Sequence, residues 1–345
     1  MSLQGKPFLF GSSLEELQDI AIELDLPGYT AQQIADWLYR KEIVSFEEMT
    51  NLSKETREKL KQFTSLGIEK PLKVQISKDG TKKYLFAAGD KFIETAYIPE
   101  DDRSTLCVSS QVGCKMACAF CMTGKQGFQN HLSAGQILNQ LKSVPESKVI
   151  SNIVFMGMGE PFDNIDNVLR ALKILTSGYG FGMASKRINV SSIGYIKGLR
   201  RFLTESDCHL AISLHNPFPE ERIRIMPVEK TNPIKEVLQI IKDFDFGRYR
   251  RVSFEYIMFK GFNDTERHVK ELARILNGIK CRINLIRFHP VPGVEVVGSD
   301  DETIFRFQNQ LKAKGIVTTL RASRGLDIAA ACGLLSTKEL IVGRK

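Results

Sequence analysis

The sequence predicts an α/β protein, because runs of branched apolar residues alternate with segments of helical periodicity over most of its 345 residues. From about Thr105 onward there are seven strand-like runs, and helix-like segments separate them. Repeating strand–helix units of this length form a parallel sheet with helices on its outer face. We therefore expect a full or partial barrel of six or seven units. The predicted strands are Leu106–Ser109, Asn152–Met156, Arg187–Ser191, Leu210–Leu214, Val252–Ile257, Arg282–Ile286 and Gly315–Leu320.

Six longer helices are predicted between these strands. Each shows apolar residues that recur every three or four positions, as one buried helix face requires. In folds of this kind the functional residues lie at the carboxyl ends of the strands, so the motifs of the site are expected there. The predicted helices are Ser133–Lys142, Asn164–Leu175, Ile196–Thr204, Pro233–Asp243, Asp264–Leu276 and Asp301–Lys314.

Two smaller regions precede the barrel. Residues 1–65 predict an N-terminal helical domain, with capping boxes at Ser12/Glu15 and Thr30/Gln33 and a third helix beginning at Ser53. Residues 66–104 predict a small β extension that contains a hairpin turn at Asp79-Gly80. Residues 105–345 then form the barrel and a C-terminal segment that carries Cys332.

Composition and charge limit the classes of function. Of all residues 43% are hydrophobic and 26% charged, and no apolar stretch approaches the roughly 20 residues of a membrane span. The first ten residues lack the basic and apolar regions of a signal peptide, so we expect a cytoplasmic protein. The net charge is +8, although residues 1–65 carry 7 Lys and Arg against 11 Asp and Glu. The remaining, basic part indicates an anionic partner such as nucleic acid, or a generically basic soluble protein.

Cys114, Cys118 and Cys121 form a Cys-x₃-Cys-x₂-Cys triplet in a loop of small residues after the first barrel strand. In a reducing compartment, clustered cysteines indicate a metal or catalysis rather than disulfides. Three thiolates can hold three irons of a [4Fe–4S] cluster and leave the fourth iron open to a ligand. A structural zinc site usually has four ligands in paired knuckles, so the spacing favours an iron–sulfur cluster.

A second motif, Gly157-Met158-Gly159-Glu160-Pro161, follows the second barrel strand. Glycines let a ligand approach the backbone closely, and a carboxylate accepts hydrogen bonds from an ammonium group. Alone, this motif is equally a tight strand-to-helix turn. Beside the cysteine loop it predicts a binding site for an amino group.

Together these motifs resemble those of radical S-adenosylmethionine (SAM) enzymes, in which the open iron binds SAM and an electron from the cluster cleaves it to a 5′-deoxyadenosyl radical. Within that superfamily, the stretches Cys107–Cys114 and 321–335 closely resemble the RlmN/Cfr family of RNA adenine methyltransferases, over about residues 15–337. The resemblance implies a partial (β/α)₆ radical SAM barrel, a [4Fe–4S] cluster with three cysteine ligands, and SAM as cofactor.

The resemblance also implies roles for three further residues. C2 of adenine is electron-poor, so methylation there needs a radical and a carrier for the methyl group. Cys332 matches that carrier: one SAM would methylate its sulfur, and the radical from a second SAM would abstract a hydrogen from the methyl. Cys107 matches the thiol that resolves the resulting protein–RNA adduct, and Glu94 the base that takes the C2 proton. In isolation, Cys107 is equally a buried thiol and Glu94 a solvated edge residue.

Contacts to SAM carry over by position. Gly159 and Glu160 match the site of the amino group, and Ser191 matches a ribose or carboxylate contact. Ser213-Leu214-His215 matches a contact at another strand end. His289 stands where the family typically has an asparagine, and a neutral imidazole can donate or accept as an amide does.

The partners implied are 23S rRNA, met before full ribosome assembly, and tRNA, with flavodoxin or ferredoxin as electron donor and no membrane; we expect a monomer. Methylation of C2 is the main hypothesis. C8 methylation of the same rRNA adenine, associated with antibiotic resistance, and a non-catalytic iron–sulfur RNA-binding factor stay open. The candidate RNA contacts are the basic clusters Lys82-Lys83, Lys197/Arg200/Arg201, Arg248/Arg250/Arg251 and Arg321/Arg324.

Overall fold

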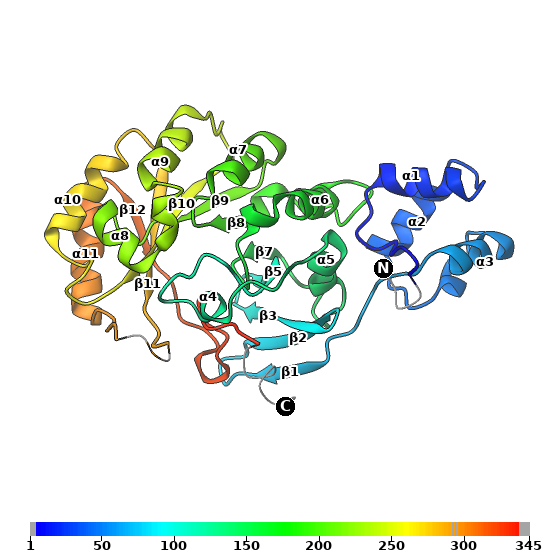
Figure 1. Cartoon of the computed structure of the whole chain (residues 1–345), viewed down its shortest axis with the longest axis horizontal. Helices are drawn as coiled ribbons and strands as arrows, with labels where there is room; N and C mark the ends of the chain where they lie inside the picture. The colour runs from blue at the N-terminus through cyan, green and yellow to red at the C-terminus, as the bar shows by residue number, and fades with distance from the viewer. Residues whose placement is uncertain (1–4, 292, 294, 338–345) are drawn as a thin grey trace.

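The computed structural model, which describes residues 5–291, 293 and 295–337, confirms an α/β fold around one twisted, open sheet (Figure 1). Seven neighbouring strands run parallel, as the alternation of strands and helices predicts. Their ends differ from the predicted ones by at most two residues. The parallel strands are β4 Ser104–Cys107, β7 Asn152–Phe155, β8 Ile188–Ser192, β9 His209–Ser213, β10 Val252–Met258, β11 Cys281–Arg287 and β12 Val317–Leu320.

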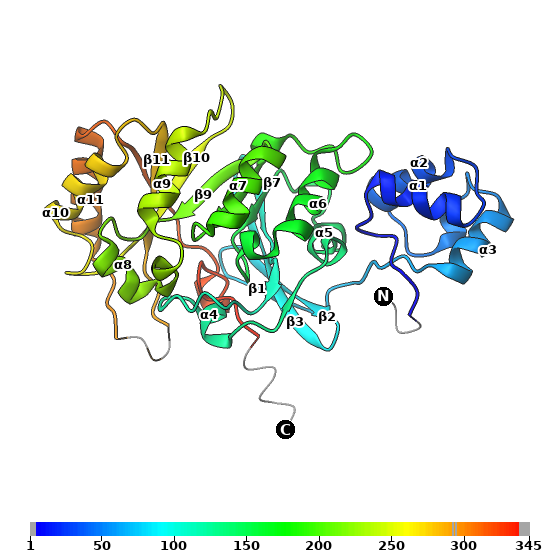
Figure 2. The same ribbon diagram turned by 45° about the horizontal axis from the view of Figure 1, so that its top comes forward.

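All six predicted helices are present, and they cover the outer face of the sheet (Figures 1 and 2). Their apolar stripes form the core with the strands, where side chains such as Phe155 and Phe254 are at most 1% exposed. No helix among the described residues is long and apolar enough to cross a membrane. The helices are α5 Ala134–Lys142, α6 Ile165–Thr176, α7 Ile196–Glu205, α9 Ile234–Asp243, α10 Glu266–Ile275 and α11 Asp301–Ala313, with the shorter α4 Met122–Gln126 and α8 Pro219–Ile225 at the carboxyl side of the sheet.

The three N-terminal helices are also present, but the first begins one residue later than predicted. They are α1 Leu14–Glu23, α2 Thr30–Tyr39 and α3 Lys54–Phe63. The capping box of α1 is formed by Ser13 and Glu16, and not by Ser12 and Glu15. Ser12 donates its N–H to the Leu9 carbonyl (3.1 Å), so it already belongs to the preceding turn.

The cap predicted for the second helix is wrong, whereas the cap of the third is confirmed. Thr30 is the first residue of α2 and follows Tyr29, which makes no side-chain cap. The Thr30 N–H donates to the Pro27 carbonyl (2.9 Å), so a turn before the helix replaces the predicted box. Ser53 accepts the N–H of Thr56 and caps α3.

The β extension continues the barrel sheet. Its strands, β1 Lys73–Ile76, β2 Lys82–Ala88 and β3 Lys91–Pro99, form an antiparallel meander, and β3 pairs antiparallel with β4. Ala96 of β3 lies opposite Cys107 of β4 in this pairing. The extension therefore places Glu94 one strand away from the predicted resolving thiol.

The segment that follows β12 crosses back to the β1–β2 turn (Figure 1, orange to red). The Asp327 carboxylate accepts hydrogen bonds from the Ser77 hydroxyl and the Lys78 N–H (3.1 Å). The Gly325 N–H donates to the Asp79 carboxylate (2.8 Å). The hairpin thus fixes the chain a few residues before Cys332.

The N-terminal helices pack on the barrel through two glycines that almost touch. A Cβ on Gly135, in the first turn of α5, would lie 2.4 Å from the Phe10 carbonyl oxygen, and a Cβ on Gly11 would lie 2.3 Å from the Gly135 nitrogen. The Tyr39 side chain accepts the Gly11 N–H (3.2 Å) and donates to the Ser12 carbonyl. Only glycine permits this approach of two backbones.

Gly135→Ala should therefore destabilise the protein, although alanine is the better helix former by about 1 kcal/mol. The new methyl group overlaps a backbone oxygen that cannot rotate away, and such overpacking costs about 1–3 kcal/mol. We expect a lower midpoint of urea unfolding than in the wild type. Gly28→Ala is the control, because its Cβ would meet nothing within 4 Å. Equal midpoints for the two variants would contradict this account.

Candidate functional site

The Gly159-Glu160 turn lies at the carboxyl end of β7, as predicted. Gly159 has φ +97°, and a Cβ there would lie 2.5 Å from the Cβ of Gln111, so only glycine fits. Glu160 turns into the interior, where its carboxylate accepts the N–H groups of Phe162 (3.0 Å) and Ile193 (2.9 Å). The second of these bonds joins the carboxyl ends of β7 and β8.

The Glu160 carboxyl group is buried without a cationic partner. It is 3% exposed, and burial raises its pKa to about 7 against the stabilising effect of its hydrogen bonds. None of the ion pairs among the described residues involves it. A buried carboxylate in this state favours a ligand that brings its own positive charge, such as the ammonium group of an amino acid.

The three clustered cysteines share one apolar region at the same end of the sheet. Cys118 is buried, whereas Cys114 and Cys121 are partly exposed and pack against the same group of side chains. The Ala119 N–H donates to the Ile225 carbonyl (2.9 Å), which holds the loop against the end of α8. Cys121 directly precedes α4.

Burial favours the neutral form of these thiols. Burial raises the pKa of Cys114 to about 12 and that of Cys118 well above its usual range, and the neighbouring thiols add to both shifts. Thiolates therefore form here only with a metal to stabilise them. No three His, Cys, Asp or Glu side chains within the described ranges stand in the geometry of metal ligands.

Cys107 and Cys332 line one cavity of about 610 Å³ inside the barrel. Both are free thiols; Cys107 is buried on β4 and Cys332 is exposed. Burial raises the pKa of Cys107 to about 12, the nearby Cys332 thiol adds to the shift, and Arg321 opposes it. Arg321 in turn forms an ion pair with the buried Glu255 (3.3 Å). The structure therefore brings together two cysteines that are 225 positions apart in the sequence.

The segment with Cys332 also contacts the cysteine loop directly. The Met122 N–H donates to the Gly333 carbonyl (2.8 Å), and a Cβ on Gly333 would lie 3.0 Å from the Phe120 carbonyl oxygen. The Thr123 hydroxyl donates to the Leu335 carbonyl (2.7 Å). The residue after the predicted methyl carrier is thus hydrogen-bonded to the residue after the predicted cluster ligand Cys121.

Glu94 lies beside this segment but does not line the cavity. It is buried on β3, where Lys83 forms an ion pair with it (3.0 Å) and the Ser336 N–H donates to it (3.0 Å). These two partners hold the Glu94 carboxylate in place on β3.

At the end of β9, the predicted contacts Ser213, Leu214 and His215 are organised by Arg222, which the sequence analysis did not identify. This buried arginine donates to the carbonyls of Ser213 (3.0 Å) and Leu214 (3.0 Å) and pairs with Glu229. The only signal in the sequence was a charged residue in a helix that packs against apolar neighbours.

His215 is held as one neutral tautomer. It has φ +54°, and its carbonyl accepts from the Asn263 side chain (2.7 Å). Its Nδ1 accepts the Ile257 N–H (3.1 Å), so Nε2 carries the proton. Burial and Arg222 lower its pKa to about 3, and its ring meets Phe120 of the cysteine loop edge-on.

The remaining predicted SAM contacts face the interior of the barrel. His289 lines the cavity of the two cysteines. Ser191 lies on the same face of β8 as the cavity-lining Asn189, two residues away. The neighbouring Ser192 points the other way; it caps the following turn and bonds to Glu160.

Several of the basic clusters proposed as RNA contacts are occupied within the protein. Lys82 pairs with Glu146 (2.6 Å) and Lys83 with Glu94, so each of these two ammonium groups already has a carboxylate partner within the protein. Arg250 donates to three backbone carbonyls and lies over the Phe202 ring. Its guanidinium thus stabilises the end of α7.

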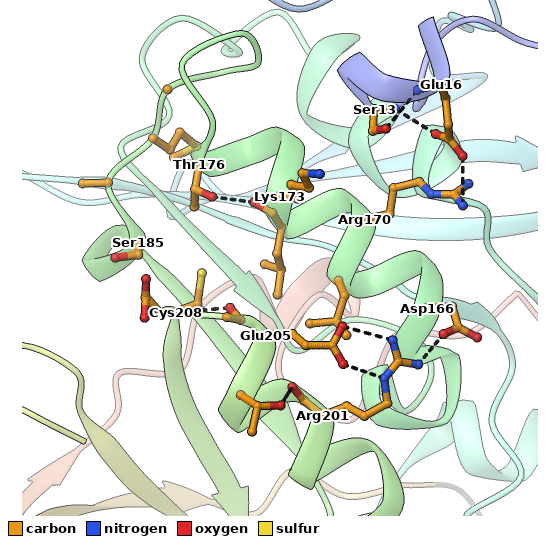
Figure 3. Close-up of a pocket in the computed structure, with 18 residues that line it drawn as sticks. Ser13, Glu16, Asp166, Arg170, Lys173, Thr176, Ser185, Arg201, Glu205 and Cys208 are labelled. Atoms are coloured by element: carbon orange, nitrogen blue, oxygen red, sulfur yellow. Dashed lines mark hydrogen bonds and ion pairs between the residues drawn. The ribbon is translucent and has the colours of Figure 1, made fainter. Parts of the chain in front are cut away.

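Arg201 is likewise occupied, in a groove of about 1040 Å³ between α1, α6 and α7 (Figure 3). It pairs with Glu205 (2.7 Å) and with Asp166, and Arg170 crosses the groove to Glu16 (3.1 Å). Both arginines of this groove are paired with carboxylates, and the groove contains none of the predicted catalytic or cofactor-binding residues.

Glu160→Gln should change how stability depends on pH. The carboxyl group has its ordinary pKa of 4.5 when unfolded and about 7 when folded. The folded protein therefore holds an extra proton between these values, and its stability falls as pH rises from 4.5 to 7 and then levels off. The glutamine variant lacks this loss, which amounts to about 3 kcal/mol. Urea unfolding between pH 5 and 8 measures it.

The control for this experiment is Glu15→Gln. Glu15 is exposed and pairs with Lys173 (2.8 Å), which lowers its pKa to about 2, so it does not titrate between pH 5 and 8. The free energy of unfolding of Glu15→Gln should therefore change with pH as that of the wild type does. If the stability of Glu160→Gln also changed with pH as that of the wild type does, burial would not be raising the pKa of the Glu160 carboxyl group.

Comparison with known proteins finds a family match for the barrel and another for the N-terminal helices. Residues 108–273 match the radical SAM superfamily, and residues 9–66 match the ribosomal RNA large subunit methyltransferase N-terminal domain. The chain is 56% identical to a probable dual-specificity RNA methyltransferase RlmN of Parabacteroides distasonis, over 95% of this chain and 96% of the relative. It is 41% identical to the dual-specificity RNA methyltransferase RlmN of Desulfotalea psychrophila, over 95% and 94%.

A solved structure agrees with this relationship. The radical SAM methyltransferase from Sphaerobacter thermophilus superposes with a TM-score of 0.89 at 37% identity, covering 95% of this chain and 99% of that one. Similarity of sequence and of structure thus covers nearly the whole chain. The chain therefore belongs to the RlmN family of radical SAM RNA methyltransferases.

Proposed function

We propose that this protein methylates C2 of an adenine in 23S rRNA and of the adenine 3′ of the anticodon in some tRNAs, with Cys332 as methyl carrier. The observation that carries the proposal is the shared cavity of Cys107 and Cys332, with Arg321 beside both thiols. RNA methylation of two kinds of substrate accords with the names of the relatives.

Two cofactors would be held at the carboxyl end of the sheet. Cys114, Cys118 and Cys121 would bind a [4Fe–4S] cluster, and Glu160 would bind the ammonium group of SAM beside it. The neutral Nε2–H of His215, together with Ser191, Ser213 and His289, would hold the rest of SAM. When bound, this pair of cofactors supplies the methyl group and the hydrogen-abstracting radical.

The residues of the cavity would carry the methyl group to RNA and release the product. The exposed Cys332 thiol receives a methyl group from one SAM and, after loss of one hydrogen, becomes joined to the adenine carbon. The Cys107 thiolate then attacks the Cys332 sulfur. The S–S bond forms while the S–CH₂ bond breaks, and the carbon keeps the electron pair and takes up a proton. Glu94 accepts the proton that leaves C2 when the adduct forms, and the one electron that the adduct radical must also give up would return to the cluster that Cys114, Cys118 and Cys121 would hold.

The reaction uses two SAM per turnover and leaves a transient disulfide. Arg321 faces both thiols, and its positive charge favours the Cys107 thiolate against the effect of burial. We also propose that the protein is a cytoplasmic monomer. It would take electrons from flavodoxin or ferredoxin and bind rRNA before full ribosome assembly. C2 is favoured over C8 because the chain has the long helical N-terminus of the C2 enzymes, residues 9–66.

Cys107→Ala should trap the protein on its RNA substrate. Without the resolving thiol, the Cys332–CH₂–adenine bond persists, so a covalent protein–RNA band should remain on a denaturing gel. Cys332→Ala should give neither adduct nor methylated RNA, because the carrier is gone. A non-catalytic iron–sulfur RNA-binding factor would leave the RNA unchanged with the wild type and with both variants.

Cys281→Ala is the matched control, since Cys281 is a free thiol on β11 that lines no part of the cavity. It should form product and no adduct. Absence of the adduct from Cys107→Ala, at full cluster loading and with an active wild type, would overturn the resolving role.

The position of methylation is tested by mass spectrometry of digested rRNA and tRNA after reaction with the wild type. We expect 2-methyladenosine in both RNAs. Because 2-methyladenosine and 8-methyladenosine have equal mass, chromatography against synthetic standards is needed to separate them. Finding 8-methyladenosine without 2-methyladenosine would favour the alternative activity and leave the roles of the cysteines intact.

A further inference from the structure

The cavity of the two cysteines extends to the amino ends of the parallel strands. Five basic residues there line it: Arg103 precedes β4, Lys186 and Arg187 precede β8, Arg251 precedes β10, and Arg282 is the second residue of β11. Because parallel strands begin at one edge of the sheet, these five side chains surround one opening. We call this opening the amino-terminal mouth.

The charge of the cavity is strongly positive. Its lining includes seven Lys and Arg residues and two glutamates. Both glutamates are already neutralised: Glu100 by Arg103 and Glu255 by Arg321. Within the described ranges, no ion pair involves Lys186, Arg251 or Arg282, so these cations are available to a ligand.

The pKa of His209, at the start of β9, is affected by the same positive charges. Burial lowers its pKa, and the nearby Arg251, Arg250 and Arg282 lower it further. No carboxylate contributes to this shift. A lining of unpaired cations that repel a proton is suited to bind phosphate.

The interior of the cavity has the size and chemistry for a nucleotide. Its volume of about 610 Å³ is in the range of ligand pockets. From Arg103 to Cys107 is four residues of extended chain, about 13 Å. The Asn189 Oδ1 atom, on a lining residue, is buried and accepts no hydrogen bond from the described chain. Such an acceptor costs stability unless a ligand donates to it.

The carboxyl end of the barrel offers less room for RNA. The cysteine loop lies there, and the Met122–Gly333 and Thr123–Leu335 hydrogen bonds tie the C-terminal segment to it. The Glu160 site lies at the same end. SAM and RNA would therefore have to share that side, unless RNA enters from the other.

We propose that RNA reaches the two cysteines through the amino-terminal mouth. Lys186, Arg251 and Arg282 bind the phosphates that flank one unstacked adenosine, and Asn189 accepts a hydrogen bond from its exocyclic amino group. A base must leave its stack to enter a cavity of this kind. The inference rests on the proposed function, because it identifies the route by which that function's substrate enters the same site.

The test compares the double variant Arg251→Gln/Arg282→Gln with a control double variant, Lys235→Gln/Lys242→Gln. The control removes the same charge from two exposed residues of α9 that lie outside the cavity and are not among the predicted RNA contacts. The probe is a synthetic anticodon stem–loop RNA, with binding measured at several salt concentrations. We expect the dissociation constant of the mouth variant to rise about tenfold or more. Its plot of log affinity against log salt should flatten by about 1.4 for two lost phosphate contacts.

Methylation of Cys332 by SAM in the absence of RNA separates the two proposals. It should occur in the wild type and in both double variants, because the mouth does not hold SAM. Its absence from the wild type would refute the carrier function, whatever the RNA affinities are. Arg251→Lys/Arg282→Lys keeps the charge and should retain most of the salt dependence, which excludes misfolding as the cause. Equal RNA binding by the mouth variant and the wild type, or equal losses in both double variants, would overturn the route.

Discussion

The hydrogen bonds that hold residues 325–335 across the end of the sheet join all parts of the site. Asp327 and Gly325 anchor this segment to the β1–β2 turn, and Gly333 and Leu335 anchor it to the start of α4. Cys332 lies between the two anchors, near Cys107 and one residue from a direct contact with the cysteine loop. The β extension and the loop thus position a residue that has no regular secondary structure of its own.

Buried charge divides the interior into regions with different roles. Glu255 is neutralised by Arg321, Glu229 by Arg222, and Glu94 by Lys83, so these carboxylates stabilise the charged arginine or lysine beside them. Glu160 differs from these three, since its carboxylate accepts hydrogen bonds from N–H and O–H groups alone and the nearby Asp163 carboxylate adds to the rise of its pKa. An uncompensated carboxylate at the end of β7 favours a cationic ligand. The unpaired cations of the amino-terminal mouth favour an anionic one at the opposite end.

Patterns of neighbouring residues predicted those helices and strands whose position is fixed by contacts between residues close in the sequence. Alternating apolar runs located all seven parallel strands, and the Ser53 cap located the start of α3. The errors arose where two choices are locally equivalent. Ser12 and Ser13 each have a glutamate three residues later, and the turn through Leu9 selects Ser13. The sequence did not show that Lys82 and Lys83 are paired, because Glu146 lies in the turn after α5 and Glu94 on β3.

The candidate site shows the same division. The spacing of Cys114, Cys118 and Cys121 and the Gly159-Glu160 turn are short-range features, and they indicated the cofactors because a few bonds of chain limit where those side chains can go. The meeting of Cys107 with Cys332, the role of Arg222 and the ring of cations at the amino-terminal mouth depend on which strands are neighbours. Strand order and the return of the C-terminal segment result from packing over the whole chain, and packing of that range leaves no periodic signal in the sequence.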